Sequence, residues 1–362
     1  MHYDFHVPTA IRFGEDSIRL LPQLEDVRGK RCLLLTYPGF DDPDLIAALH
    51  VSSSFFVRSD AFEENPSHGL VRALGQHVVA DEIETIIAIG GGSTIDSAKG
   101  ASWFAANPHY GEDGAEGPLT DPTAKIVAAP TTAGTGSEVS PFVVLTDSAH
   151  HRKTSVKHMG LAPSVALCDP ALTVSMPRSV TADTGIDAVS HAVEAYLSSL
   201  CHGFLDDLSV GVFRTVHTNL PRVLSDPNDM ISRGKMLSAA VEGGLVLAAC
   251  GTVIIHAVGY RINETIHVPH GRVNAMLMPA YIEFLVDKGV SRASEIEELF
   301  GGSLKGFTES CRLPSSVPTS GVTDDDIENW VEGAMATYGL PNCIAPLSEA
   351  DVRTIIANAM AA

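Results

Sequence analysis

The sequence predicts an N-terminal α/β domain over residues 1–177 and an all-helical C-terminal domain over residues 178–362. Up to about Pro177, short β-rich runs alternate with helical patterns, which is typical of a doubly wound sheet of parallel strands. From Ala182 onward, apolar residues recur at helical spacing and β-rich runs are almost absent. A chain of 362 residues is also long enough for two domains.

The expected elements of the first domain follow from their apolar patterns. Residues 85–89 (TIIAI) are continuously apolar, as in a strand that is buried on both faces of a parallel sheet. Residues 66–81 place their apolar side chains on one face of a helix. In chain order, we expect strands at 32–37, 53–57, 85–89, 125–129 and 165–167, and helices at 44–50, 66–81 and 93–106.

The second domain is expected to contain helices because its apolar residues recur every three to four positions. Residues 312–321 (RLPSSVPTSG) are rich in Pro and Ser and are expected to form a loop between helices. The expected helices are 183–200, 206–220, 229–249, 252–265, 272–286, 291–300, 324–338 and 349–360.

Composition excludes several classes of protein. With 45% hydrophobic and 19% charged residues, the bulk of the chain is not disordered. The 24 basic and 44 acidic residues give a net charge of −20, so neither nucleic acid nor an anionic membrane is an expected partner. Six cysteines without a C-x-x-C pair indicate reduced thiols. Residues 1–14 lack a signal-peptide pattern, and the apolar stretch 243–259 is too short to span a membrane, so we expect a soluble, cytoplasmic protein.

A glycine-rich loop follows the strand at 85–89 and opens the next expected helix. Its sequence, IGGGST at residues 89–94, lets the backbone approach a phosphate closely. Ser93 or Thr94 is expected to cap the helix, whose free N–H groups and dipole favour an anion. The spacing is not G-x-G-x-x-G, and the alternative is a tight turn that binds nothing.

A second loop, PTTAGTGSE at residues 130–138, follows the strand at 125–129. It contains four hydroxyl side chains and two glycines, which can donate hydrogen bonds to a ribose, a pyrophosphate or an amide. Because the carboxyl ends of parallel strands share one edge of a sheet, the two loops together favour a dinucleotide over a mononucleotide.

One carboxylate and three imidazoles form a candidate metal site. Asp187 and His191 are four residues apart, which places both on one face of a helix. His256 lies on a later helix, and His270 lies in the expected loop at 268–271. This ligand set suits Zn²⁺ or Fe²⁺. The alternative, for any single histidine among the 15, is a core or surface role.

Four segments together resemble the iron-containing (group III) alcohol dehydrogenases, from about Phe5 to the last helix. They are GGGSTIDSAKG at 90–100, APTTAGTGSEVS at 129–140, TGIDAVSHAVEAY at 184–196, and His256 with the later PHG at 269–271. The resemblance implies a dinucleotide-binding domain and a helical metal-binding domain, an architecture shared with dehydroquinate synthase. It also implies NAD or NADP and Fe²⁺, with Zn²⁺ as the alternative metal, and a homo-oligomer such as a dimer.

The resemblance further implies roles for single residues. The metal ligands would be Asp187, His191, His256 and His270. The cofactor contacts would be Gly91, Gly92, Ser93, Thr131, Thr132 and Leu172, with Lys153 near the ribose.

This chain departs from the family pattern at two places. Tyr260 stands where many members have a second histidine that is thought to assist proton transfer, and Arg261 follows it where proline is common. Residues 36–39 (TYPG) lack the Asp that NAD-preferring members often carry after the first strand, and they also lack a Lys or Arg that would attract a 2′-phosphate. The preference between NAD and NADP is therefore left open.

The expected activity is a metal-dependent, NAD(P)H-linked alcohol dehydrogenase that acts as reductase of a small aldehyde. The metal would polarise the carbonyl, and Tyr260 is a candidate proton donor. Arg261 suggests an anionic aldehyde, sulfoacetaldehyde or phosphonoacetaldehyde, unless its side chain points outward to solvent. The alternatives are a simple aliphatic alcohol dehydrogenase, a maleylacetate-reductase-type enzyme and a dehydroquinate-synthase-like lyase.

Overall fold

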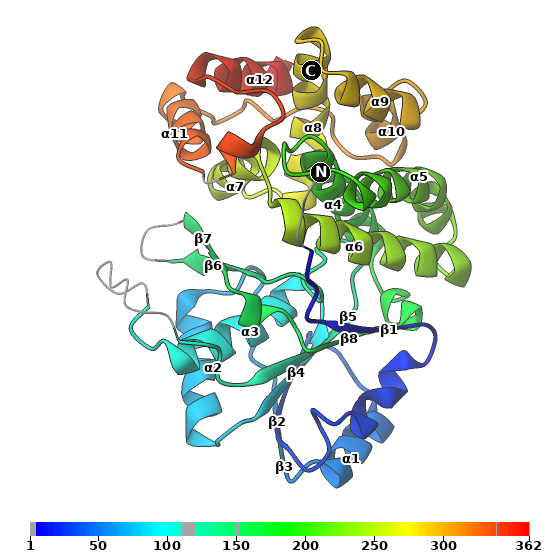
Figure 1. Ribbon diagram of the computed structural model, residues 1–362, viewed down its shortest axis with the longest axis vertical. Helices are drawn as coiled ribbons and strands as arrows, with labels where there is room; N and C mark the ends of the chain where they lie inside the picture. The colour runs from blue at the N-terminus through cyan, green and yellow to red at the C-terminus, as the bar shows by residue number, and fades with distance from the viewer. Residues whose placement is uncertain (1–4, 111–119, 149–151, 338, 362) are drawn as a thin grey trace. The chain divides into compact units, whose positions relative to one another are not determined.

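The computed structural model describes residues 5–110, 120–148, 152–337 and 339–361. Two parts of the expected features lie outside these residues. They are residues 1–4 of the N-terminal segment 1–14, and Tyr338, the expected last residue of the helix at 324–338. Contacts divide the chain into two compact units, one of Met1–Thr132 and Ser137–Thr173, the other of Ala133–Gly136 and Val174–Ala362. The first unit is α/β and the second is helical, which confirms the predicted fold class (Figure 1).

A parallel sheet forms the centre of the first unit. Among the described residues it has six strands, in the order β1-β8-β5-β4-β2-β3 (Figure 1). Edge strand β1 was not expected, because its four residues (AIRF) are half exposed and form no continuous apolar run. The strands are β1 (Ala10–Phe13), β2 (Arg31–Thr36), β3 (Phe55–Ser59), β4 (Thr85–Gly90), β5 (Lys125–Pro130) and β8 (Val165–Cys168).

The strand order reverses next to β2. This strand pairs with β3 on one side and with β4 on the other. The later strands β5 and β8 follow β4, on the side of β2 opposite to β3. The backbone N–H of Tyr37, just after β2, donates to the carbonyl of Ile89 in β4 at 3.1 Å. The carboxyl ends of β2 and β4 are therefore neighbours at the switch point, where open α/β sheets bind their ligands.

Helices cover both faces of this sheet. Leu34, Ile87 and Val127 pack on one face with the 3₁₀ helix η1 (Ser17–Gln23) and α1 (Pro43–Ser52). The alternate residues of the same strands pack on the other face with α2 (His68–Ala80) and α3 (Gly92–Ala106). The η2 (Met159–Leu161) and η3 (Pro170–Thr173) segments complete the unit, together with an unexpected antiparallel hairpin of β6 (Phe142–Asp147) and β7 (Arg152–Lys157).

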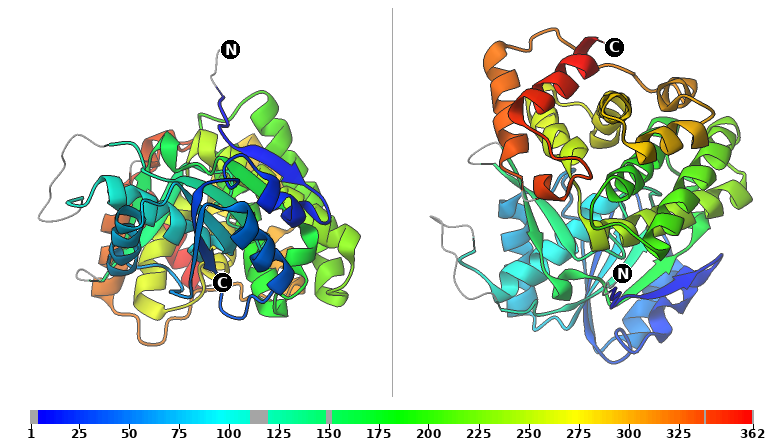
Figure 2. Two further views of the ribbon diagram at one scale, coloured as in Figure 1. Left: turned by 90° about the horizontal axis from the view of Figure 1, so that it is seen from below. Right: turned by 45° about the horizontal axis from the view of Figure 1, so that its top comes forward.

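The second unit is built around helix α4, which is buried at every residue from Gly185 to Tyr196. Helices α5, α6, α7 and α8 all pack against it. The short α10 was not expected from the sequence. The helices are α4 (Arg178–Tyr196), α5 (Phe204–Ser225), α6 (Met230–Cys250), α7 (Ile254–Ile266), α8 (His270–Asp287), α9 (Ser291–Leu299), α10 (Leu304–Ser310), α11 (Asp324–Met335) and α12 (Glu349–Ala361), with the 3₁₀ turn η4 (Leu340–Asn342) (Figure 2).

Two boundaries in this unit bear on the candidate site and on the apolar stretch noted in the sequence. Helix α8 begins at His270, so this residue belongs to the first turn of a helix and not to a loop. The apolar stretch 243–259 is interrupted, as expected from the two predicted helices 229–249 and 252–265, because α6 ends at Cys250 and α7 starts at Ile254. Among the described residues no single helix passes the length and hydropathy test for a membrane span, although α6 and α7, bent by 105° at their break, pass it as a pair.

Candidate functional site

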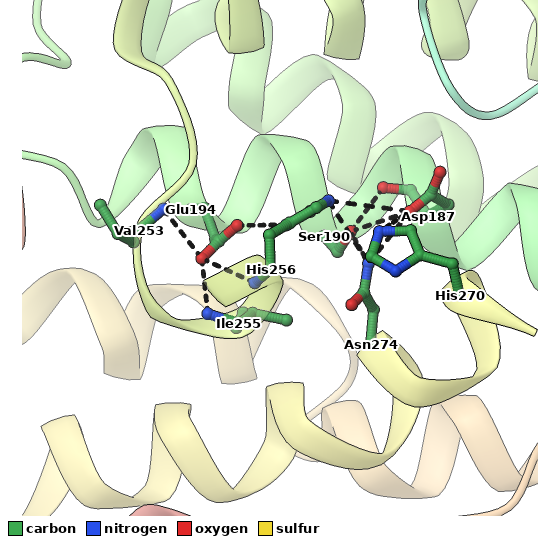
Figure 3. Close-up of polar contacts among 8 residues, drawn as sticks. All are labelled: Asp187, Ser190, Glu194, Val253, Ile255, His256, His270 and Asn274. Carbon is green, nitrogen blue, oxygen red and sulfur yellow. Dashed lines mark hydrogen bonds and ion pairs between the residues drawn. The ribbon is translucent and has the colours of Figure 1, made fainter. Parts of the chain in front are cut away.

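Three of the four expected metal ligands converge in the second unit. Asp187 Oδ1 lies 3.9 Å from His256 Nε2 and 3.8 Å from His270 Nε2 (Figure 3). All three ligand atoms lie within 4.8 Å of one another. Metal–ligand bonds of about 2.1 Å place the ligand atoms of a tetrahedral site about 3.4 Å apart, so a small contraction would fit this group to one cation.

His191 lies beside this group but is not part of it. Its ring stacks on that of His256, with centroids 4.9 Å apart and planes inclined by 20°. The side chain is buried, and its Nδ1 atom has no hydrogen-bond partner among the described residues. Burial lowers the pKa of His191, which favours the neutral imidazole that binds metals.

Glu194 was missed by the sequence analysis. This carboxylate is fully buried and accepts hydrogen bonds from Nδ1 of His256 and from the backbone N–H groups of Val253 (3.0 Å) and Ile255 (2.6 Å) (Figure 3). The bond to Nδ1 leaves Nε2 of His256 as the acceptor that faces Asp187, the usual second-shell arrangement of a metal-binding histidine. The available signal was spacing, since Glu194 follows His191 by three residues on α4.

Asn274 was also missed, although it lies one turn after His270 on α8. Its Nδ2 group donates to Asp187 Oδ1 at 3.0 Å and lies 3.3 Å from His270 Nε2 and 3.4 Å from His256 Nε2 (Figure 3). The three candidate ligand atoms thus surround a hydrogen-bond donor. Such a set of converging acceptors is chemically suited to a cation.

Tyr260 and Arg261 have different surroundings, although they are consecutive. Tyr260 stacks on His270 with ring centroids 4.9 Å apart, so it lies at the candidate metal site. Arg261 instead pairs with Glu264 at 2.9 Å and packs against α11, where a Cβ atom on Gly333 would lie 2.4 Å from its Nε. One residue corresponds to about 100° around a helix, which separates the two side chains. The structure does not bring Arg261 into the group.

The glycine-rich loop joins helix α3 without the side-chain cap that was expected. Helix α3 begins at Gly92, and its N-cap residue, Gly91, makes no side-chain capping bond. Capping by Ser93 or Thr94 was therefore wrong. Ser93 Oγ accepts from the backbone N–H of Asn65 at 3.2 Å. Thr94 lies under Gly90, where a Cβ atom would be only 2.2 Å from Thr94 Oγ1.

The two loops meet at the carboxyl ends of β4 and β5. The N–H of Thr131 donates to the carbonyl of Gly90 at 3.0 Å, and a Cβ atom on Gly91 would lie 3.0 Å from Thr132 Cγ2. Residues 91–93 are half-buried and form the N-terminus of α3, where N–H groups and the helix dipole favour a phosphate. This geometry suits the phosphate site proposed from the sequence.

The other two expected cofactor residues lie in the same unit. Lys153 Nζ donates to Asn65 Oδ1 at 3.0 Å, which places it near Ser93. Leu172, in η3, packs against the apolar cluster that contains Ile89.

A buried lysine, which the sequence analysis did not single out, holds the second loop. Lys99 Nζ donates to Ser137 Oγ (2.8 Å) and to the carbonyls of Ser140 (2.9 Å) and Phe142 (2.7 Å). Its carboxylate neighbour, Asp96 Oδ1, is 4.0 Å away. Burial lowers the pKa of Lys99 to about 8. These bonds tie the end of the loop to α3.

Comparison with known proteins identifies the family. The model of the iron-containing alcohol dehydrogenases matches residues 8–170, and the model of the C-terminal domain of the same family matches residues 181–360. The chain belongs to the iron-containing alcohol dehydrogenase family. This family uses NAD(P) and Fe²⁺.

Curated members of this family match different shares of the chain. The probable alcohol dehydrogenase EutG of Escherichia coli is 38% identical over 200 residues, which are 55% of this chain and 51% of that protein. An aldehyde-alcohol dehydrogenase of Streptococcus pneumoniae is 32% identical over 87% of this chain but only 38% of its own length. The chain thus spans about half or less of these relatives. The NADPH-dependent butanol dehydrogenase of Clostridium saccharobutylicum is 29% identical over 91% of this chain and 89% of its own.

Solved structures of the family have the same fold. An iron-containing alcohol dehydrogenase of Thermotoga maritima superposes with a TM-score of 0.88 at 29% identity and covers 100% of both chains. A sulfoacetaldehyde reductase of Bifidobacterium kashiwanohense, solved with NAD⁺, has a TM-score of 0.86 at 25% identity and covers 99% of this chain and 98% of its own.

Proposed function

We propose that the chain is a metal-dependent, NAD(P)H-linked alcohol dehydrogenase that reduces a small aldehyde. The observation that carries the proposal is the convergence of Asp187, His256 and His270 on one point of the helical unit. When bound, Fe²⁺ would polarise the carbonyl oxygen as a Lewis acid, and the nicotinamide would supply the hydride.

The chain's own residues would hold and orient these groups. Asp187, His256 and His270 would ligate the metal, with His191 as the fourth ligand after a turn of its ring. Glu194 would keep Nε2 of His256 available to the metal. In the other unit, the N-terminus of α3 with residues 91–93 and the loop at 131–132 would bind the cofactor, together with Lys153 and Leu172.

Tyr260 is the proposed proton donor to the product alkoxide. Its ring stacks on His270, so the residue lies beside the proposed metal ligands. A tyrosine hydroxyl, with an ordinary pKa near 10, is protonated at neutral pH and suited to donate.

The surroundings of Arg261 favour an uncharged aldehyde. Its guanidinium group is neutralised by Glu264 and packs against α11. An anionic aldehyde such as sulfoacetaldehyde or phosphonoacetaldehyde is the second candidate, supported by the sulfoacetaldehyde reductase among the similar structures. Assembly as a homodimer and a cytoplasmic location stay predictions from the sequence.

A substrate panel on iron-loaded protein tests the proposal. Propanal, butanal and sulfoacetaldehyde would be reduced with NADH and with NADPH, while nicotinamide absorbance is followed. We expect stoichiometric cofactor oxidation that a chelator abolishes, with a higher kcat/KM for the uncharged aldehydes. Reduction that is unaffected by removal of the metal would contradict the metal-dependent reaction. Conversion of a substrate without net cofactor oxidation would instead indicate a lyase.

A further inference from the structure

An open loop lies at the switch point of the sheet. It follows β2 and comprises residues 37–42, of which Pro38, Gly39 and Asp41 are exposed. Gly39 has a positive φ of 88°, and a Cβ atom built on it would meet nothing within 4 Å. In dinucleotide-binding sheets, the end of this strand recognises the adenosine ribose, by a carboxylate for the 2′-hydroxyl or an arginine for a 2′-phosphate.

Arg58 brings a positive charge to this loop from the neighbouring strand. In the parallel register of β2 and β3, Arg58 pairs with Leu34. Its Nη2 atom donates to the carbonyl of Phe40 at 3.1 Å and reaches Thr36 Oγ1 at 3.4 Å. The guanidinium is therefore held on both sides of residues 37–39, by the Thr36 hydroxyl and by the Phe40 carbonyl, while 30% of the side chain stays exposed.

The acidic groups around Arg58 leave part of the guanidinium available. Asp60 pairs with its Nε atom at 3.0 Å, but this carboxylate is 82% exposed, so the pair is a weak one. Asp42 is engaged elsewhere, since it pairs with Arg19 at 2.8 Å and caps α1. Asp41 is exposed. No hydrogen bond is formed by Nη1 of Arg58 within the described part of the chain.

We propose that Arg58 forms a binding site for the 2′-phosphate of NADP(H), so that the chain accepts the phosphorylated cofactor. The inference rests on the proposed function, because it assigns a subsite of the same cofactor. Residues 36–39 themselves contain no Lys or Arg, as noted from the sequence. Strand pairing instead brings an arginine from elsewhere in the chain, since it places Arg58 beside Thr36, which is 22 positions away in the sequence.

Two nucleotide fragments test the site without requiring turnover. Binding of 2′,5′-ADP and of 5′-AMP to the whole protein would be measured by calorimetry at low salt. We expect 2′,5′-ADP to bind about tenfold or more tightly than 5′-AMP, as for a charge-assisted phosphate contact. In Arg58→Ala the two affinities should become equal, with the affinity for 5′-AMP unchanged.

Arg31→Ala is the matched control. Arg31 lies on β2 at the opposite end of the sheet, where it binds the carbonyl of Asp81 and packs over Phe55, so the preference for 2′,5′-ADP should persist. Asp60→Asn covers the case in which Arg58→Ala fails to fold. This exposed substitution frees the guanidinium and should strengthen 2′,5′-ADP binding several-fold.

The outcomes separate this inference from the function on which it rests. Equal binding of the two fragments to the unaltered protein would overturn the assignment of Arg58 and leave the dehydrogenase proposal standing. Failure of both fragments, of NADH and of NADPH to bind would overturn both. If Arg58→Ala still preferred 2′,5′-ADP, the assignment of Arg58 would be wrong, because another residue would bind the 2′-phosphate.

Discussion

Glu194 accepts a hydrogen bond from Nδ1 of His256, and this bond determines which nitrogen of the ring faces Asp187. The two residues are 62 positions apart, on α4 and at the start of α7. The same carboxylate also accepts backbone N–H groups at the break between α6 and α7. Glu194 therefore couples the sharp bend of the chain to the orientation of a proposed metal ligand.

Glu194→Gln is expected to weaken iron binding about 10- to 100-fold. The amide cannot hold His256 in the same tautomer as firmly, and outer-shell partners typically contribute that much to metal affinity. Competition with a chelator of known affinity measures the effect, and Glu295→Gln is the control because Glu295 pairs with Tyr196 away from the three candidate ligands. If the two variants bound iron with equal affinity, Glu194 would not be needed to orient His256.

Gly271→Ala should damage both the fold and the metal site. A Cβ atom at this position would lie 2.0 Å from the carbonyl oxygen of Asp183 and 3.3 Å from Cβ of Asp187, so α8 must move away from α4. We expect a loss of about 2–3 kcal/mol in the free energy of unfolding and a loss of iron affinity.

Gly211→Ala on α5 is the matched control for this change, because its new Cβ atom would meet only the end of the Glu242 side chain, at 3.4 Å. Urea unfolding of both variants provides the comparison. If Gly271→Ala were as stable as Gly211→Ala, the close approach of α4 and α8 at this glycine would be refuted.

Glu138→Gln should change how stability depends on pH. Glu138 is 1% exposed, and burial raises its pKa from 4.5 to about 7. Between these values the folded chain retains a proton that the unfolded chain has released, so the free energy of unfolding falls as pH rises from about 4.5 to 7. The glutamine variant should lack this decline, which amounts to about 3 kcal/mol.

Urea unfolding at pH 5, 6 and 7 measures this slope, with Glu64→Gln, an exposed position, as the control. A slope that is the same in the parent protein and in Glu138→Gln would show that Glu138 is already ionised across this range.

Tyr260→Phe should lower kcat about 10- to 100-fold while leaving iron content unchanged. Phenylalanine keeps the ring that stacks on His270 and removes only the hydroxyl group proposed as the proton donor. Single-turnover aldehyde reduction and metal analysis give the two readouts. An unchanged kcat would assign the proton transfer to another group.

The sequence predicted the elements whose pattern is strong. The continuous apolar runs of β2, β4 and β5 were found to within one residue at each end, and the long helices α4 to α8 to within five. Two of the missed strands have weak patterns, since β1 is a half-exposed edge strand and the β7 sequence, RKTSVK, has no apolar alternation that marks one buried face. The third, β6, has an apolar run (FVVLTD) that was not assigned to a strand. His270 was assigned to a loop at 268–271, whereas α8 begins at this residue, directly after Pro269.

The candidate site was only partly accessible from the sequence. Spacing alone paired Asp187 with His191, yet in the structure Asp187 joins His256 and His270, which come from other helices. Glu194, Asn274 and Arg58 act through tertiary contacts with residues 62, 87 and 22 positions away, respectively, and no local pattern records such contacts.

Anaerobic titration with Fe²⁺ tests the central claim most directly, by comparing the parent protein with Asp187→Ala. The account predicts one tightly bound iron per chain in the parent and a loss of about 100-fold or more in affinity in the variant, with circular dichroism showing that both are folded. Equal iron affinity in the two folded proteins would contradict the proposed metal centre.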